Sequence, residues 1–196
     1  MSVTTVMLVG VGGQGTILAS DVLAKVAAAS GLDVKLAEVH GMSQRGGSVD
    51  TVVRFGEKVF SGTIDPGAAD HLVSFEMIEA GRWVHWLRPG GRLVVNRRII
   101  PSLPMLTGDC GMPTGLEAAL AYEGAVFLDA EGLACEAGSP RSANMVLMGA
   151  LSVGLPFHED AWRDVISHRV PPKTVDANIA AFDRGRRECT DGECGL

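Results

Sequence analysis

Two glycine-rich loops, each directly after a strand-like run, constrain this chain most. Residues 10–15 read Gly-Val-Gly-Gly-Gln-Gly and follow the apolar run of residues 6–9. Residues 40–47 read His-Gly-Met-Ser-Gln-Arg-Gly-Gly and follow the run of residues 34–39. In an open α/β sheet, ligands bind outside the carboxyl ends of adjacent strands. The two loops therefore predict one phosphate-bearing ligand held between them.

The first hundred residues predict strands that alternate with helices. A buried strand over residues 3–9, a helix over 16–30 and a strand over 34–39 form one βαβ unit, expected to be right-handed with parallel strands. Residues 48–55 alternate in polarity, and after a turn residues 59–64 are predicted to return as the second strand of a hairpin. The hairpin makes the predicted sheet mixed rather than purely parallel.

The remaining pattern predicts three more strands and then a helical end. The strands are expected over residues 72–75, 92–96 and 125–128, the intervening helices over 76–87, 115–123 and 130–137, a loop over 101–113, and the last helices over 143–153, 159–168 and 175–187. This order predicts a three-layer, Rossmann-like α/β sandwich with a mostly parallel, mixed sheet, one hairpin and a helical C-terminal third. We expect one domain over residues 1–188 and a flexible tail over residues 189–196.

Composition excludes several classes of protein. The net charge is −6, which argues against a nucleic-acid-binding surface, and the arginines at 97–98 and at 184, 186 and 187 are expected on solvated faces. No apolar stretch approaches the roughly 18 residues that span a bilayer, and no signal-peptide pattern opens the chain, so we expect a cytoplasmic protein. Reduced thiols are then expected, and Cys189 and Cys194 have the wrong spacing for a metal site.

The first loop carries the G-x-G-x-x-G pattern at Gly10, Gly12 and Gly15. Glycines allow a tight turn and close backbone approach, and a helix N-terminus offers N–H groups to phosphate. Gln14 adds an amide near the helix start. Glu38, at the end of the next strand, is where a dinucleotide-binding fold keeps an acid for ribose. The alternative is that the glycines only pack a tight turn, and the pattern alone does not distinguish NAD, FAD and coenzyme A.

The second loop places an arginine among small residues. Arg45 supplies a fixed donor fork that suits phosphate or carboxylate, and Ser43 and Gln44 add neutral donors beside Gly46 and Gly47. The alternative is an arginine paired with a local carboxylate, Asp50 or Glu38. We find no catalytic motif and no nucleophile–base pair, so no catalytic residue is assigned.

Five segments together resemble a known family. Residues 12–15, 38–47, 90–96, 144–150 and 178–185 resemble the gamma-type subunit of 2-oxoacid:ferredoxin oxidoreductases. The Ser-Gln-Arg-Gly-Gly form is most similar to the small (beta) subunit of indolepyruvate ferredoxin oxidoreductase. The resemblance implies a large (alpha) partner that carries thiamine diphosphate, magnesium and iron–sulfur clusters. It also implies that this chain is inactive alone and contacts coenzyme A through Gly12, Gly13, Gln14, Gly15, Ser43, Gln44, Arg45, Gly46 and Gly47.

The resemblance further implies the reaction. The complex would convert indolepyruvate, coenzyme A and oxidised ferredoxin to indoleacetyl-CoA, carbon dioxide and reduced ferredoxin, or pass the electrons to another carrier. Two alternatives come from the glycine loops alone: a stand-alone NAD(P)-dependent oxidoreductase, or a nucleotide-binding regulatory module.

Overall fold

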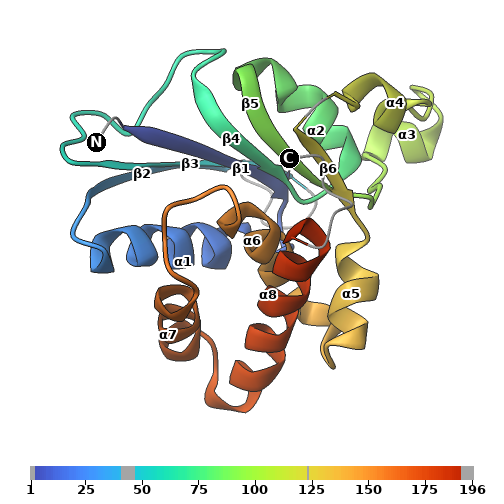
Figure 1. The fold of residues 1–196 in the computed structure, drawn as a ribbon. Coiled ribbons are helices and arrows are strands. Elements are labelled where there is room, and N and C mark those ends of the chain that lie inside the picture. Colours follow the sequence, from blue (N-terminus) through green and yellow to red (C-terminus); the bar gives the residue numbers. More distant parts are fainter. Residues whose placement is uncertain (1–2, 41–46, 123, 191–196) are drawn as a thin grey trace.

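The chain folds around a six-stranded mixed sheet with helices on both faces. The computed structural model describes residues 3–40, 47–122 and 124–190. The strands lie in the order β2-β3-β1-β4-β5-β6. Figure 1 shows α2 and α4 above this sheet and α1 and α5–α8 below it, so the predicted three-layer α/β sandwich is confirmed.

The central strands are continuous apolar runs, as expected for strands buried on both faces. β1 (Thr4–Val11) pairs in parallel with β4 (Ala69–Ser74), which pairs in parallel with β5 (Leu87–Asn96), and β6 (Ala125–Leu128) completes this half of the sheet. Three parallel strands therefore end at the same edge as β1.

The predicted βαβ unit is interrupted by a strand. α1 (Thr16–Ala29) connects β1 to β2 (Asp33–His40), but β3 (Ser48–Gly56) lies between these strands and is antiparallel to both. β1 and β2 consequently run in the same direction without touching. The expected parallel direction of these two strands is confirmed, whereas the strand between them was not foreseen, because a local pattern does not report strand order.

The hairpin is real but involves different strands. β2 and β3 are its two arms, and residues 59–64, predicted as the return strand, are irregular. The apolar residues that suggested a strand there have another role: Val59 is buried and donates its N–H to Asp33, while Phe60 is 90% exposed.

The upper layer is thin. α2 (Met77–Trp83) continues as the 3₁₀ helix η1 (Val84–Trp86), where the sequence predicted one helix, and α4 (Leu116–Leu120) lies beside α2. α3 (Leu103–Thr107) forms within the predicted loop of residues 101–113. Met7, Leu72 and Leu93 on the sheet pack against Met77 and Leu120 on this side.

The lower layer holds most of the core. Its helices after α1 are α5 (Ala130–Glu136), α6 (Ala143–Ser152), α7 (Glu159–Arg169) and α8 (Val175–Thr190), with 3₁₀ turns η2 (Pro140–Ser142) and η3 (Pro172–Thr174). α6 is buried along its length, and two glycines bring it against α8. A Cβ at Gly149 would clash with the carbonyl oxygen of Phe182, and one at Gly185 with the carbonyl oxygen of Val146.

The C-terminal boundary differs from the prediction. α8 continues to Thr190 and buries Cys189, so the tail expected from residue 189 begins inside a helix. Residues 191–196, with Cys194, lie outside the described residues. Within the described parts of the chain, no helix combines the length and apolar character needed to cross a lipid bilayer.

Candidate functional site

The first glycine loop turns β1 sharply into α1. Gly10 lies where a Cβ would meet the Cβ of Phe75 at 2.8 Å, so the strand end allows no side chain. Gly13 has φ +99° with open space around it, and Gly15 precedes α1 at φ 81° without a side-chain cap. The first N–H groups of α1 have no side-chain acceptor at the N-cap, which is the arrangement that binds anions at helix starts.

Gln14 is used by the fold. Its Oε1 accepts the N–H of Val11 at 2.7 Å, and its Nε2 donates to the carbonyl oxygen of Phe75 at 2.8 Å. The side chain therefore joins the loop to the end of β4. Each end of the amide thus has one partner within the fold, while Nε2 keeps a second N–H, so Gln14 shapes the cavity wall and its predicted ligand contact stays a prediction.

The two glycine loops meet at one described contact. The N–H of Gly12 donates to the carbonyl oxygen of Gly47 at 2.9 Å. Next to it, Ser48 donates its hydroxyl to Glu79, a buried carboxylate on α2 that also accepts from Trp83. Ser43, Gln44, Arg45 and Gly46 lie outside the described residues, so their predicted contacts stay predictions.

A cavity of about 560 Å³ lies at the carboxyl ends of β1, β4 and β5. This is the edge of the sheet at which doubly wound folds bind ligands. Of the predicted site residues, Gly12, Gly13 and Gln14 line it. The other lining residues come from strand ends and from α5, η2 and α6: Phe75, Asn96, Arg98, Ile100, Glu131, Pro140, Arg141, Ala143, Asn144 and Leu147.

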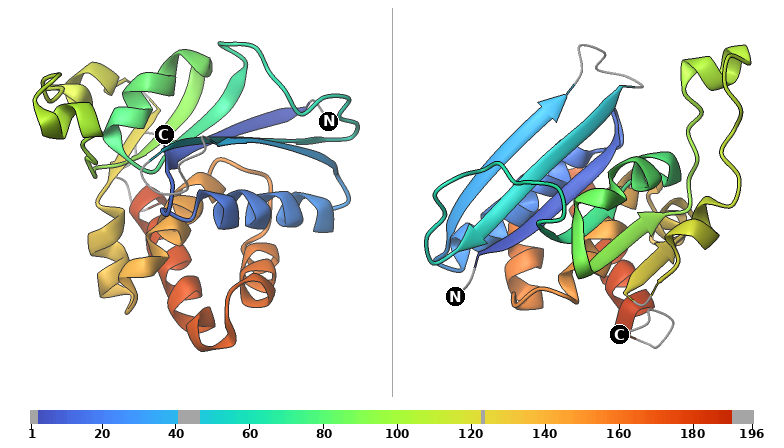
Figure 2. Two further views of the ribbon diagram at one scale, coloured as in Figure 1. Left: turned by 180° about the vertical axis from the view of Figure 1, so that it is seen from behind. Right: turned by 90° about the horizontal axis from the view of Figure 1, so that it is seen from above.

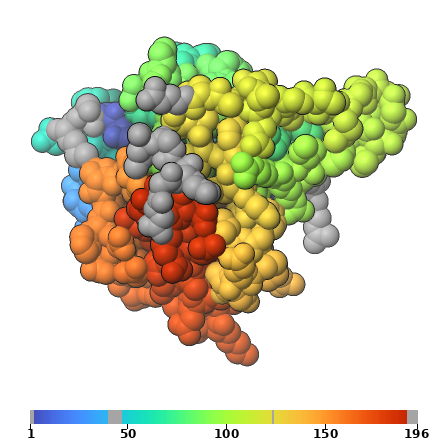
Figure 3. All heavy atoms as spheres, turned by 45° about the vertical axis from the view of Figure 1, so that its right-hand side comes forward, coloured from blue at the N-terminus to red at the C-terminus, as the bar shows by residue number. Residues whose placement is uncertain are grey.

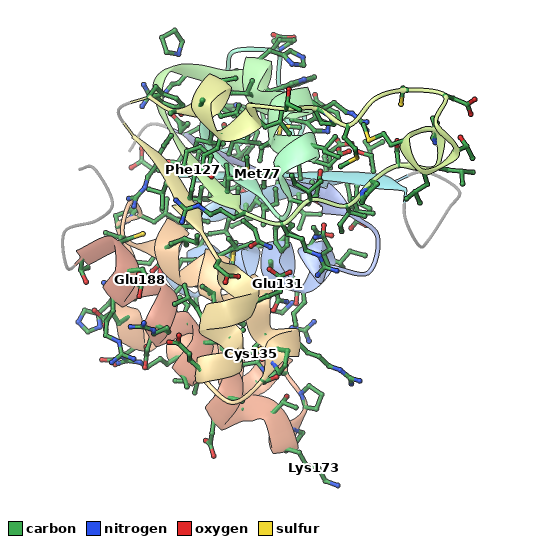
Figure 4. The ribbon with its side chains drawn as sticks, turned by 90° about the vertical axis from the view of Figure 1, so that its right-hand side faces the viewer. Met77, Phe127, Glu131, Cys135, Lys173 and Glu188 are labelled. Carbon is green, nitrogen blue, oxygen red and sulfur yellow. The ribbon has the colours of Figure 1, made fainter. Side chains whose placement is uncertain are left out.

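One wall of the cavity is a closed polar network. Glu131 pairs with Arg98 at 2.8 Å and accepts the amide of Asn96 at 2.9 Å. Asn96 also accepts the N–H of Ala130 at 3.1 Å, so β5 and α5 are joined here. Figure 4 shows Glu131 at the end of α5 nearer the sheet, with Cys135 further along the helix. These groups satisfy one another and hold the wall in place.

Arg141, unlike the paired Arg98, is a cavity arginine without a partner among the described residues. It lies in η2, is exposed, and forms no hydrogen bond or ion pair with any described residue. A neighbouring residue, Asn144, donates its amide to the carbonyl oxygen of Gly15 at 3.3 Å and so ties α6 to the first glycine loop. The described lining of the cavity thus combines one unneutralised positive charge with a glycine-rich helix start, which suits an anionic ligand.

Sequence reasoning missed Arg98, Glu131 and Arg141. Arg98 was expected on a solvated face, and it is exposed, yet it also lines the cavity. The available signal was position, because Arg98 follows the predicted strand of residues 92–96 and Glu131 follows that of residues 125–128. Arg141 precedes a helix that follows no strand, and no pattern pointed to it.

The geometry disfavours a dinucleotide site. In that fold the ribose-binding acid ends the strand next to β1. Here Glu38 is on β2, and Thr51 of β3 lies between it and Leu8 of β1. The described residues that line the cavity include two arginines, one glutamate and no histidine, cysteine, serine or lysine. Among the described residues, no three His, Cys, Asp or Glu side chains are grouped to hold a metal ion.

Comparison with solved structures identifies the same fold. The gamma subunit of a keto/oxoacid ferredoxin oxidoreductase from Geobacter sulfurreducens superposes with a TM-score of 0.72 over 96% of this chain and 99% of that chain, at 23% identity. A 2-oxoglutarate:ferredoxin oxidoreductase from Magnetococcus marinus, solved with 2-oxoglutarate, coenzyme A and succinyl-CoA bound, superposes with a TM-score of 0.76 over 99% of this chain and 32% of that chain, at 22% identity.

Comparison of sequences is more specific. The indolepyruvate oxidoreductase subunit IorB of Thermococcus kodakarensis is 43% identical over 187 residues, which cover 92% of this chain and 93% of the relative. A sequence model of one family, pyruvate ferredoxin/flavodoxin oxidoreductase, matches residues 5–188. The chain therefore belongs to the pyruvate ferredoxin/flavodoxin oxidoreductase family.

Proposed function

We propose that this chain is the small subunit of a cytoplasmic 2-oxoacid:ferredoxin oxidoreductase that acts on indolepyruvate and that it helps to bind coenzyme A. The reaction converts indolepyruvate, coenzyme A and oxidised ferredoxin to indoleacetyl-CoA, carbon dioxide and reduced ferredoxin. Support for the substrate comes from the IorB relative at 43% identity. The observation that carries the coenzyme A role is the cavity that Arg141 and the first glycine loop line together.

The cavity suits the phosphate-bearing end of coenzyme A. Gly12 and Gly13 let phosphate approach the loop before α1, whose start has no side-chain cap, and Arg141 supplies a charge that no described residue neutralises. Charge-assisted hydrogen bonds to phosphate are among the stronger ones in proteins. Ser43, Gln44, Arg45, Gly46 and Gly47 complete the proposed site from the second loop, and Gln14 shapes its wall.

The proposal divides the work between two subunits. Thiamine diphosphate, magnesium and the iron–sulfur clusters are assigned to the large partner, as is the docking of ferredoxin or another acceptor. This chain then binds and orients coenzyme A so that its thiol reaches the partner, and it has no turnover alone.

Kinetics of the assembled complex test the site. Arg141→Ala should raise the KM for coenzyme A about tenfold, since a charge-assisted phosphate contact contributes about 1.5 kcal/mol. The kcat and the KM for indolepyruvate should stay unchanged, and Arg141→Lys should recover part of the loss. Arg88→Ala is the matched control, because Arg88 is exposed at the start of β5, whereas the cavity lies at that strand's other end.

The second loop is tested in the same assay. Arg45→Ala should also raise the KM for coenzyme A without changing that for indolepyruvate. If neither Arg141→Ala nor Arg45→Ala changes the KM for coenzyme A, this subunit does not bind the coenzyme. Tight binding of NAD(P) by the isolated chain would instead favour a dehydrogenase.

A further inference from the structure

One segment of the chain projects from the body of the molecule. We call residues 99–114 the arm; it joins β5 to α4 and contains the short helix α3. Figure 2 shows the arm, in yellow-green, standing clear of the sheet and of the other helices, and Figure 3 shows it protruding in the space-filling view. From Arg97 to Ala119 not one residue is buried. The arm therefore gains almost no stability from packing against its own chain.

The surface of the arm is apolar rather than charged. Leu103 and Leu106 are 72% and 70% exposed, and their spacing of three places them on one side of α3. Ile99 and Met112 add further exposed apolar surface, and Asp109 is the one charged residue of the arm's sequence. A five-residue helix is far too short to be stable in water by itself. Exposed apolar groups gathered in this way mark interaction surfaces.

The root of the arm is firmly held, which gives the arm a defined direction. The N–H of Arg97 donates to Leu128 at 2.7 Å, and the N–H of Met77 donates to the carbonyl oxygen of Arg98 at 2.7 Å. Arg97 also pairs with Glu117 on α4, on the far side of the arm, at 3.0 Å. Two strands and two helices thus fix both ends of a segment whose apolar tip is exposed.

The arm leaves the body at the rim of the cavity. Arg98 and Ile100, at its root, line the proposed coenzyme site. On the proposed function, on which this inference rests, the large subunit must face that cavity, because the bound coenzyme has to reach the large subunit's reacting centre. A subunit seated there would lie directly beside the arm. The nearly uncharged tip is complementary to an apolar groove and offers no charge pattern to nucleic acid or to a charged surface.

We propose that the arm docks into an apolar groove of the large oxidoreductase subunit and anchors the small subunit over the shared active site. The anchor is distinct from the coenzyme contacts: Leu103 and Leu106 hold the partner, while Arg141 and the glycine loop hold the ligand. The proposal therefore separates assembly from coenzyme binding, and substitutions at the tip should change the first without changing the second.

Assembly is tested with charged substitutions at the tip. L103E combined with L106E should weaken the affinity for the large subunit at least about 30-fold, as expected for loss of two central apolar contacts at an interface. The melting temperature of the isolated variant should stay unchanged, because neither leucine is packed. L36E combined with F60E is the matched control: both residues are exposed apolar groups on the β2 side of the molecule, and assembly should keep its normal affinity.

Site-specific crosslinking then identifies the occupant. A photoreactive phenylalanine analogue at position 106, in the assembled complex, should crosslink to the large subunit. A crosslink to a second copy of this chain, or no crosslink at all, would overturn the proposal, as would normal assembly of L103E/L106E. If the wild-type chain binds no large subunit, the proposed function fails as well. If the wild type and L103E/L106E both assemble with normal affinity, only the proposal about the arm is wrong.

Discussion

The lower helical layer and the arm both contain apolar helices, but the first buries its apolar side chains and the second exposes them. In the lower layer, α6 is buried along its whole length and lies so close to α8 that two glycines are required at the crossing. In the arm, helix α3 buries none of its residues although Leu103 and Leu106 are as apolar as Leu147 of α6. Apolar sequence alone therefore does not tell whether a helix belongs to the core or to a surface.

The difference teaches what each region depends on. The lower layer is stabilised within the chain, so its substitutions should appear as changes in unfolding free energy. The arm is stabilised little by contacts within the chain, so substitutions there should change the affinity for a partner and leave the unfolding free energy unchanged. Three measurements on the isolated chain test this difference between the two regions.

The largest effect is expected at the helix crossing. Gly185→Ala places a Cβ against the backbone of Val146, and a backbone atom cannot move aside as a flexible side chain can. The helices must separate, which should lower the free energy of unfolding by about 3 kcal/mol or more. Urea unfolding followed by far-UV circular dichroism measures the loss.

Gly111→Ala in the arm is the matched control. A Cβ there meets nothing within 4 Å, so the change should stay within about 0.5 kcal/mol. Equal effects of the two glycine substitutions would contradict the contrast between the regions.

A second effect depends on pH and on His71, which faces the loop after α6. Burial lowers the pKa of His71 to about 4 from 6.5, with Arg92 and Arg88 adding to the shift and Asp70 opposing it. Its Nδ1 finds no hydrogen-bond partner among the described residues. Below pH 6.5 the unfolded chain takes up this proton while the folded chain does not, so stability falls as the pH falls from 6.5 toward 4.

The size of this effect follows from the shift. Between pH 7.5 and pH 5 the wild type should lose about 2 kcal/mol of unfolding free energy that His71→Asn does not lose, since one pKa unit corresponds to about 1.4 kcal/mol. Urea titrations of both proteins at several pH values make the comparison. Parallel pH profiles would show that His71 is accessible to protons in the folded protein.

The smallest effect is expected in the arm. Leu103→Ala combined with Leu106→Ala should change the unfolding free energy of the isolated chain by less than about 0.5 kcal/mol, because both side chains are already in water. Leu147→Ala, a truncation of the same side chain in the core, should cost about 2–5 kcal/mol. A large loss from the arm variant would mean that the arm folds back on the body in solution.

Sequence patterns predicted the fold class because the strands and the lower helices are long and periodic. β6 was placed at its observed bounds, and α6 and α7 within a residue of theirs. Strand order was not predicted, since nothing local in β3 indicates that it lies between β1 and β2. Residues 59–64 were predicted wrongly as a strand, because a buried residue such as Val59 beside other apolar residues gives the short apolar run that is typical of strands.

The candidate site was predictable only in part. The glycine loop carries a backbone requirement that is visible in sequence, and Gly12 and Gly13 do line the cavity. The partners of a side chain are not visible in the same way. Gln14 looked available and is bonded to Val11 and Phe75, whereas Arg141 looked ordinary and is the cation that the described cavity leaves unpaired.

The insertion of β3 has a consequence for how this subunit can diversify. The first glycine loop is a strand-to-helix turn wedged between Phe75 and Asn144, so a change in its length would displace α1 and α6. The second loop joins two neighbouring antiparallel strands, β2 and β3, rather than a strand to a helix. A change in the length of the connection between β2 and β3 should therefore leave the packing of α1 and α6 intact, which would let one scaffold acquire new ligand preferences without being refolded.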